Sequence, residues 1–297
     1  MRLSTSTNIM VFDQNKPRQV SMEDATIACA KAGYKYVDAN LCGACRTEQP
    51  LTQDNWEEWA HNLRRTADDH GVTFAQTHAY YTLGEAFNPD MSRADGELGE
   101  ELMRRSVLTS QILGAHWMVV HPYTIYKGQR WYHYHESFAY NREYFKRWGE
   151  FFADHNVGMA IENMGRSPHK IPYCCRGEEL LELIDAIDNP MVQICIDTGH
   201  AHFSGLNPAE VIRLVGSHLK ATHIADNHQN GDEHYAPFNG TINWKDVMKA
   251  LKEINYKEDF SFEIQNLSAM YPKQLQQKLV DSSYELGQYL INMPIDN

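Results

Sequence analysis

The sequence predicts an α/β fold, a (β/α)8 TIM barrel, on three observations. Short β-rich runs alternate with longer amphipathic segments, and each kind of segment occurs eight times along the 297 residues. In addition, six apolar runs end on a residue that can bind a metal ion. These six residues are His78, His121, Glu162, Asp197, His223 and Glu263. Because strand C-termini converge on one mouth of such a barrel, the sequence predicts a metal site there.

The predicted strands are short runs rich in β-branched and aromatic residues. They span residues 3–11, 35–39, 73–78, 116–121, 158–162, 192–197, 220–224 and 259–264. The predicted helices span residues 22–32, 54–70, 95–113, 137–155, 178–187, 208–217, 244–254 and 272–291. No linker rich in Pro, Gly or Ser divides them, so we expect residues 1–297 to form a single barrel domain.

Residues at the predicted helix ends agree with this assignment. Gly33, Gly71 and Gly114 each follow a helix and precede a strand, which is typical of helix C-terminal glycines. Asn207 before Pro208 predicts an N-cap followed by proline in the first turn, and Asn243 is a second expected N-cap. The aromatic segment 123–136 is long for a loop. It could line a substrate pocket, cover the barrel mouth or form a subunit contact.

Composition narrows the function classes. The net charge of −12 argues against a broad basic surface for nucleic acid, so no nucleic-acid partner is favoured. No run approaches 18 apolar residues, so we expect no membrane span, and the N-terminus is predicted to be a strand and not a signal peptide. Six cysteines without a secretion signal predict reduced thiols and a cytoplasmic location. The lone CxxC of Cys42 and Cys45 is interpreted as loop cysteines.

Four residues form the predicted core of the metal site. Glu162, Asp197, His223 and Glu263 supply three carboxylates and one imidazole, a set that suits Mn²⁺, Mg²⁺, Co²⁺ or Zn²⁺. An isolated acidic residue at a strand end can instead cap a neighbouring helix, but four on separate strands favour a metal site. Further candidates around this core are His78, His121, His200, Asp232 and His234. The sequence has no Walker-type, GxGxxG or G-x-S-x-G motif, so neither a nucleotide cofactor nor a serine hydrolase is predicted.

Several segments resemble the xylose isomerase-like TIM-barrel superfamily. They are IENMG, CIDTGH, THIAD, DEHYAPFNGTINW and FEI. Within the fourth segment a D-x-H-x-x-P-x-x-G-x-I-x-W pattern is formed by Asp232, His234, Pro237, Gly240, Ile242 and Trp244. The superfamily includes sugar and sugar-phosphate isomerases and epimerases, and the endonuclease IV family of DNA repair.

The epimerase branch of this resemblance implies a metal-dependent mechanism. A divalent metal would be held by Glu162, Asp197, His223 and Glu263, and the two glutamates would move protons through a metal-stabilised enediolate. The resemblance implies that His200 contacts the substrate during catalysis. Arg166 could contact a substrate oxygen or phosphate, or form a salt bridge on the rim. The other expected substrate-binding residues are His78, His121, His200, Asp232 and His234. We therefore expect a sugar or sugar-phosphate isomerase or epimerase, with a homo-oligomer possible through helix 272–291.

Two other functions share these residues. Endonuclease IV holds three zinc ions with nine ligands, and candidates for all nine occur here: His78, His121, Glu162, Asp197, His200, His223, Asp232, His234 and Glu263. ENMGRS and DTGH replace the TAGQG-like and DTCH segments of that family. A keto-sugar lyase or deglycosidase would use the same metal, with aromatic residues against the aglycone. Those aromatic residues are Tyr80, Tyr81, Trp131, Tyr132 and Tyr134. A non-catalytic sugar sensor is disfavoured by the intact carboxylates.

Overall fold

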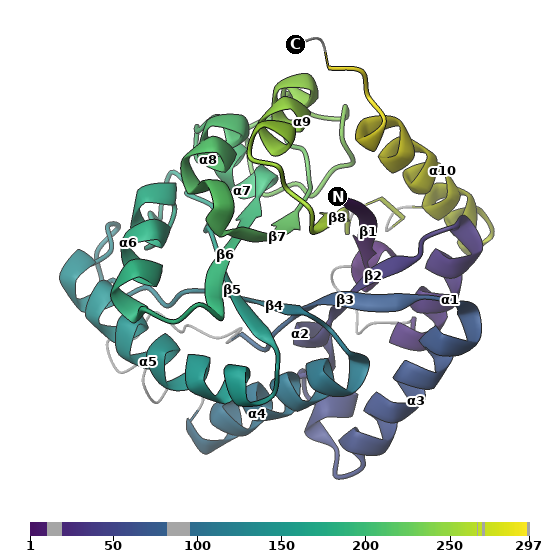
Figure 1. Cartoon of the computed structure of the whole chain (residues 1–297), viewed down its shortest axis with the longest axis horizontal. Coiled ribbons are helices and arrows are strands. Elements are labelled where there is room, and N and C mark those ends of the chain that lie inside the picture. Colours follow the sequence, from purple (N-terminus) through teal and green to yellow (C-terminus); the bar gives the residue numbers. More distant parts are fainter. Residues whose placement is uncertain (11–19, 82–95, 266, 269–270, 296–297) are drawn as a thin grey trace.

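Eight parallel strands form the centre of the molecule, and helices surround them (Figure 1). The structure is a computed structural model that describes residues 1–10, 20–81, 96–265, 267–268 and 271–295. The strands are β1 (Arg2–Ser6), β2 (Tyr36–Asn40), β3 (Thr73–His78), β4 (Trp117–Val120), β5 (Gly158–Glu162), β6 (Val192–Asp197), β7 (Leu219–His223) and β8 (Asp259–Phe262). Their order β7-β6-β5-β4-β3-β2-β1-β8 follows the chain around the sheet, as a (β/α)8 barrel requires.

The helices between the strands form the outer ring. They are α1 (Met22–Ala32), α3 (Trp56–His70), α4 (Gly96–Leu113), α5 (Tyr134–Asp154), α6 (Gly177–Ile187), α8 (Pro208–Val215), α9 (Trp244–Glu253) and α10 (Lys273–Ile291). Two short helices, α2 (Leu41–Ala44) and α7 (Thr198–Phe203), follow β2 and β6 directly. Short 3-10 turns are η1 (Thr7–Met10), η2 (Pro50–Thr52) and η4 (Gly216–His218). None of the helices within the described part of the chain is long and apolar enough to span a bilayer.

The sheet closes between β7 and β8 at Ile224, one residue beyond β7. The Ile224 amide donates to Ser261 O at 2.8 Å, and Ile224 O accepts from the Glu263 amide at 3.0 Å. The Thr222 hydroxyl adds a bond to Asp259 O at 2.8 Å. Closure brings the C-terminal ends of all eight strands to the same mouth, so the residues that end them become neighbours.

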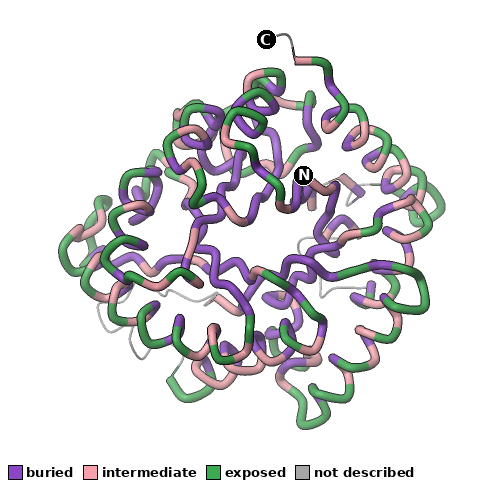
Figure 2. Tube along the Cα trace, viewed as in Figure 1, coloured by how far each residue is buried: buried purple, intermediate pink, exposed green. Residues whose placement is uncertain are grey.

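Two apolar layers hold the barrel together. Inside it, the small side chains of Val119, Ala160, Cys195 and Ala221 pack together in one layer. Outside it, the strands contact the apolar faces of the helices, and Figure 2 shows the strands buried while the outer faces of the helices are exposed. Gly158 must stay a glycine, because an added Cβ would lie 2.3 Å from Trp117 Cε3.

Most predicted elements lie within two residues of the observed bounds, and two differ more. The first strand was predicted over 3–11, but it ends at Ser6, after which residues 7–10 form η1; residue 11 lies outside the described part. The helix predicted over 137–155 begins at Tyr134, so the last three residues of the aromatic segment 123–136 are helical. The aromatic residues of this segment have a weak helix preference, so the first turn of the helix was not predicted. Tertiary packing overrides such local preferences.

The predicted caps are confirmed. Gly33, Gly71 and Gly114 have φ values of 110°, 64° and 78°, a left-handed conformation that glycine adopts at little cost. The Asn207 side chain accepts from the Ala209 amide, and Asn243 accepts from the Asp246 amide. These caps fix where α8 and α9 begin, immediately after the loops that leave the barrel mouth.

Candidate metal centre

Four consecutive strands deliver the four predicted metal ligands to one point. Glu162 ends β5, Asp197 ends β6, His223 ends β7, and Glu263 follows β8 by one residue. Ligand atoms from all four lie within 4.8 Å of one another, and all four residues are buried. His223 Nδ1 lies 2.9 Å from Glu162 Oε1 and 3.5 Å from Glu263 Oε2. The structure thus brings together the four residues that the sequence predicted as the core of a metal site.

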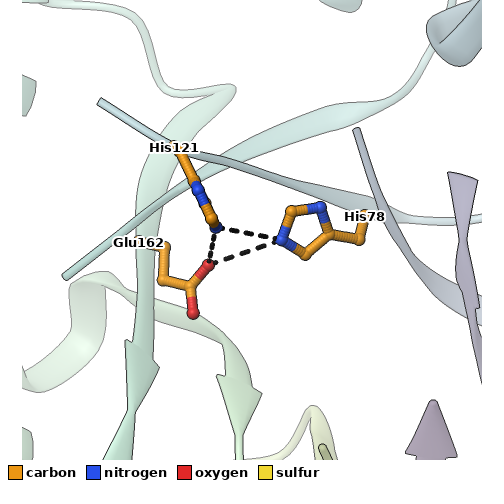
Figure 3. Close-up of side chains that lie close together, drawn as sticks. All are labelled: His78, His121 and Glu162. Carbon is orange, nitrogen blue, oxygen red and sulfur yellow. Dashed lines mark hydrogen bonds and ion pairs between the residues drawn. The ribbon is translucent and has the colours of Figure 1, made fainter. Parts of the chain in front are cut away.

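A second group shares Glu162 with the first. His78 at the end of β3 and His121 just after β4 both direct Nε2 toward Glu162 Oε2, at 3.6 Å and 2.9 Å (Figure 3). The two Nε2 atoms are themselves 3.1 Å apart. As in the first group, the ligand atoms of His78, His121 and Glu162 all lie within 4.8 Å of one another. Glu162 therefore stands at the junction of two sets of residues that could hold a cation.

A third group lies on the other side of the carboxylates. His200 Nε2 and His234 Nε2 are 3.3 Å and 3.1 Å from the same oxygen of Asp232. Each ring is fixed from behind, since His200 Nδ1 donates to Asn163 O at 2.8 Å and His234 Nδ1 donates to Glu263 O at 2.9 Å. Both histidines therefore direct Nε2 toward the carboxylate. His200 also lies 3.6 Å from Glu162 Oε1, which connects this group to the first.

Burial and charge act in opposite directions on these groups. Burial alone would raise the pKa of Glu162, but His223 and His121 hold it well below its ordinary value. Burial would lower the pKa of His223, but Glu263 and Glu162 hold it well above its ordinary value. Burial likewise works against the charge on His234, yet Asp232 raises its pKa to about 10. Neighbours of opposite charge therefore hold the carboxylate of Glu162 and the imidazoles of His223 and His234 in their charged forms.

Asp197 is the exception, and it shows that the cluster fits a cation. Its side chain is fully buried, and Oδ2 has no hydrogen-bond partner. Burial raises the pKa of Asp197 to about 7, an effect that His200 opposes. A buried carboxylate oxygen without a donor is costly unless a cation neutralises it. The hard oxygen and imidazole donors present are those that Mn²⁺, Co²⁺, Mg²⁺ and Zn²⁺ accept.

Asp226 organises the segment that carries Asp232 and His234. Its Oδ2 accepts from the Phe238 amide and from Trp244 Nε1 at 3.0 Å and 2.8 Å. Its Oδ1 accepts from the Ile242 amide at 3.1 Å. An added Cβ on Gly240 would lie 2.3 Å from Asp226 Oδ1, so the loop can close around this carboxylate only with glycine there. The residues of the G-x-I-x-W part of the sequence motif thus surround the buried Asp226 carboxylate.

Asp38 is a residue of the site that the sequence analysis did not single out. It lies on β2, its Oδ2 is 3.3 Å from His223 Nε2, and Gln76 Nε2 donates to the same oxygen at 2.7 Å. A shift in the β2–β3 register between Val37 and Asp38 places Asp38 opposite Gln76. Such irregularities commonly redirect a side chain near an active site. Asp38 therefore fixes the ring of His223 so that Nδ1 faces the carboxylates, the arrangement of a carboxylate that orients a metal-binding histidine. Its signal in the sequence was an acidic residue at the end of YKYVD, inside the strand predicted over 35–39.

Replacing Asp38 with asparagine is expected to weaken divalent-metal affinity by about 10- to 100-fold, because the variant keeps the size but loses the charge that orients His223. Isothermal titration with Mn²⁺ or Co²⁺ would measure this. Asp259→Asn is the matched control, since Asp259 is also a buried strand aspartate but lies at the opposite end of the barrel, 2.8 Å from Arg2. Unchanged affinity in Asp38→Asn would contradict the positioning role.

Arg166 and the cysteines lie outside the three groups described above. Arg166 lies exposed on the loop after β5, where its amide donates to Ser204 Oγ at 2.8 Å, and no ion pair to the carboxylates is formed among the described residues. Cys42 and Cys45 are buried in and just after α2 and not in an open loop, and burial raises their pKa values to about 11 and about 12. Cys195 is a second residue that the sequence analysis did not single out, and it lies within reach of Glu162 and His223. Burial raises the pKa of the Cys195 thiol well above the usual range.

Comparison with known proteins shows the family of this chain. The family model described as "Xylose isomerase-like TIM barrel" matches residues 27–284. The chain belongs to this family. Its curated relatives include sugar 3-epimerases and probable endonucleases 4.

Three relatives show how far the similarity extends. The chain is 24% identical over 255 residues to the L-ribulose 3-epimerase of Methylomonas sp. (strain DH-1), covering 84% of this chain and 80% of that protein. It is 33% identical over 121 residues to the protein MJ1311 of Methanocaldococcus jannaschii, but this match spans only 40% of either chain. A crystal structure of D-psicose 3-epimerase in the presence of D-fructose superposes with a TM-score of 0.76 at 15% identity, covering 98% of this chain and 99% of that one. The last similarity concerns the fold.

Proposed function

We propose that this protein is a divalent-metal-dependent sugar epimerase or isomerase that acts on a ketose or a related keto-sugar. The observation that carries the proposal is the convergence of Glu162, Asp197, His223 and Glu263 within 4.8 Å. Curated relatives named as ketose 3-epimerases point to the same substrate class. The metal residues, their roles and the metal's identity are part of this proposal.

The reaction needs two groups that move protons on either side of a carbon next to a carbonyl. When bound, a divalent cation would polarise the carbonyl and stabilise the negative charge of the enediolate. Glu162 and Glu263 come from β5 and β8, with β6 and β7 between them, and both present carboxylate oxygens at the cluster. One glutamate would remove the carbon-bound proton and the other would return a proton to the opposite face.

The surrounding residues orient the substrate in this proposal. His200 and His234 have Nε2 fixed toward Asp232 by hydrogen bonds from their Nδ1 atoms to backbone oxygens, which makes them rigid contacts for sugar hydroxyls. His78 and His121, which contact Glu162, would bind the substrate from another side. Rigid contacts of this kind place the reacting carbon close to a base, which is a large part of catalysis.

A second candidate function is phosphodiester cleavage at a trinuclear zinc site of the endonuclease IV type. The specific observation is that all nine candidate ligands lie in three connected groups around Glu162, Asp197 and Glu263. Within them, His200 and His234 direct Nε2 at one oxygen of Asp232. The net charge of −12 argues for the sugar reaction over DNA.

Metal stoichiometry and proton exchange together distinguish the two functions. Elemental analysis of protein purified without chelator should give about one divalent metal per chain, and the metal-loaded protein should exchange deuterium from solvent into a ketose. Three zinc ions per chain, with cleavage of abasic duplex DNA and no exchange, would replace the epimerase proposal with the second candidate. Exchange accompanied by release of an aglycone from a keto-glycoside would identify a lyase.

A further inference from the structure

Two adjoining cavities lie beside the candidate metal centre, lined by the loops after β4 and β5 and by residues that follow β6 and β7. One has a volume of about 320 Å³ and the other about 340 Å³, and both are lined by Arg166 and Ser204. We call the two together the arginine cleft. Its remaining charged lining residues are Arg130 and Arg176. We propose that the arginine cleft binds an anionic group, a phosphate or a carboxylate, carried by the sugar substrate at a distance from the reacting carbon.

The charge of the cleft is the first argument. The chain has 39 acidic and 27 basic residues, so an average surface region should carry more carboxylates than cations. None of the described residues that line the arginine cleft is acidic, although three are arginines. The cavities elsewhere differ, since the cavity between α4 and α5 is lined by five acidic residues and two arginines. A local reversal of charge in an acidic protein indicates an anionic ligand.

The state of the arginines is the second argument. Arg176 is already paired with the buried Glu179 at 2.9 Å, and Tyr132 donates to that same carboxylate. In contrast, neither Arg130 nor Arg166 forms an ion pair with any residue in the described ranges. Arg130 stacks over the ring of Trp131 with its guanidinium carbon 5.9 Å from the ring centroid. Two guanidinium groups therefore remain available to an incoming phosphate or carboxylate, which arginine binds in bidentate geometry.

The walls of the cleft are held in place before any ligand arrives. The Ile171 amide donates to Arg130 O at 3.1 Å, and the Tyr173 amide donates to Thr124 Oγ1 at 3.2 Å, so the two loops are bonded to each other. The Arg166 amide is bonded to Ser204 Oγ on the far side. A preformed site loses less entropy on binding than a flexible one.

The cleft lies next to the metal centre. Gly165, which precedes Arg166, packs against His200, since an added Cβ would lie 3.1 Å from His200 Cδ2. Phe203, which lines one of the cavities, is the other neighbour of Gly165, at 3.3 Å. His200 in turn lies 3.6 Å from Glu162 Oε1. The proposal therefore places the reacting carbon at the carboxylates and the anionic group of the same substrate in the neighbouring cleft. This inference rests on the proposed sugar reaction for its substrate but not for its anion site.

The test compares three ketoses that differ only at carbon 6: D-fructose with a hydroxyl, D-fructose 6-phosphate, and D-fructuronate with a carboxylate. Solvent-deuterium exchange by the metal-loaded full-length protein gives kcat/KM for each. We expect an anionic ketose to exceed D-fructose by about tenfold or more, the size of one charge-assisted contact. The phosphate and carboxylate arms identify which anion is preferred. Arg166→Gln should remove the preference, and Arg130→Gln should reduce it.

Arg142→Gln is the control, because Arg142 is an exposed arginine on α5 paired with Glu143 at 2.8 Å, and it should keep the preference. A binding assay separates the cleft from the reaction: calorimetric titration with inorganic phosphate should show binding that Arg166→Gln loses. Equal exchange of all three ketoses would overturn the cleft proposal and leave the epimerase proposal standing. Phosphate binding that depends on Arg166, without exchange of any ketose, would support the cleft and contradict the epimerase. Phosphate binding that Arg166→Gln leaves unchanged would overturn the cleft.

Discussion

Replacing Glu263 with glutamine is expected to slow carbon-bound proton exchange by about 100- to 10,000-fold, the usual contribution of a positioned acid or base. Glutamine keeps the size of the side chain, and the 3.3 Å contact between Gln265 Nε2 and Glu263 Oε1 can persist with an amide oxygen. What the variant loses is the basic carboxylate, so the fold should survive while exchange fails. Deuterium incorporation at saturating metal, followed by NMR, measures the effect.

Two controls separate a loss of the catalytic carboxylate from a loss of metal or of general stability. Metal affinity of Glu263→Gln must be measured separately, because Glu263 is also a predicted ligand, and exchange must be compared at full metal occupancy. Glu258→Gln is the matched substitution at the other end of the same strand, where Glu258 lies 3.4 Å from Arg2, and it should exchange normally. A rate of deuterium exchange in Glu263→Gln equal to that of the wild-type protein would contradict the proposed mechanism.

Replacing Glu162 with glutamine is expected to cause the largest loss of metal binding. Glu162 belongs to two of the groups of ligand atoms described above, one with Asp197, His223 and Glu263 and the other with His78 and His121. Its loss should exceed the roughly 10- to 100-fold cost of removing an outer partner. Metal at about 100 times its Kd should stabilise the wild-type protein by about 2.7 kcal/mol. This stabilisation should disappear in Glu162→Gln.

Thermal unfolding with and without Mn²⁺ or Co²⁺ gives the measurement. Glu179→Gln serves as the comparison, because Glu179 is also a buried glutamate but lies on α6 and pairs with Arg176. That variant should still be stabilised by metal, even if its baseline stability falls. A metal-induced shift of wild-type size in Glu162→Gln would show that the cation binds elsewhere.

Much of this site could be predicted from local patterns. Polar residues at the ends of apolar runs located Glu162, Asp197, His223 and His78 on their strands, because a strand is short and its hydrophobic pattern is clear. The count of alternating elements predicted the barrel, and parallel strands in a barrel must end at one mouth. His121 and Glu263 were predicted to lie within their strands, but each lies one residue beyond the observed end of β4 or β8, which leaves them at the same mouth.

Other features had no local signature. The helix α7 follows directly from Asp197, whose side chain caps it by accepting from the His200 amide at 2.7 Å, so one carboxylate both belongs to the cluster and begins a helix. Asp226 resembles any aspartate after a strand until the loop 232–244 is seen to fold around it. Arg166 was predicted near the substrate, but only the loop geometry places it in a separate cleft beside His200.

The sequence by itself therefore determined the fold class and the set of residues that could bind a metal, since both follow from periodicity and residue type along single strands. The tertiary structure decided which atom of each residue faces the cluster. Asp38 and His223 are 185 positions apart, and they meet only because the barrel closes and the β2–β3 register shifts beside Asp38. Contacts over such separations depend on the packing of the whole sheet, and no local pattern of residues encodes them.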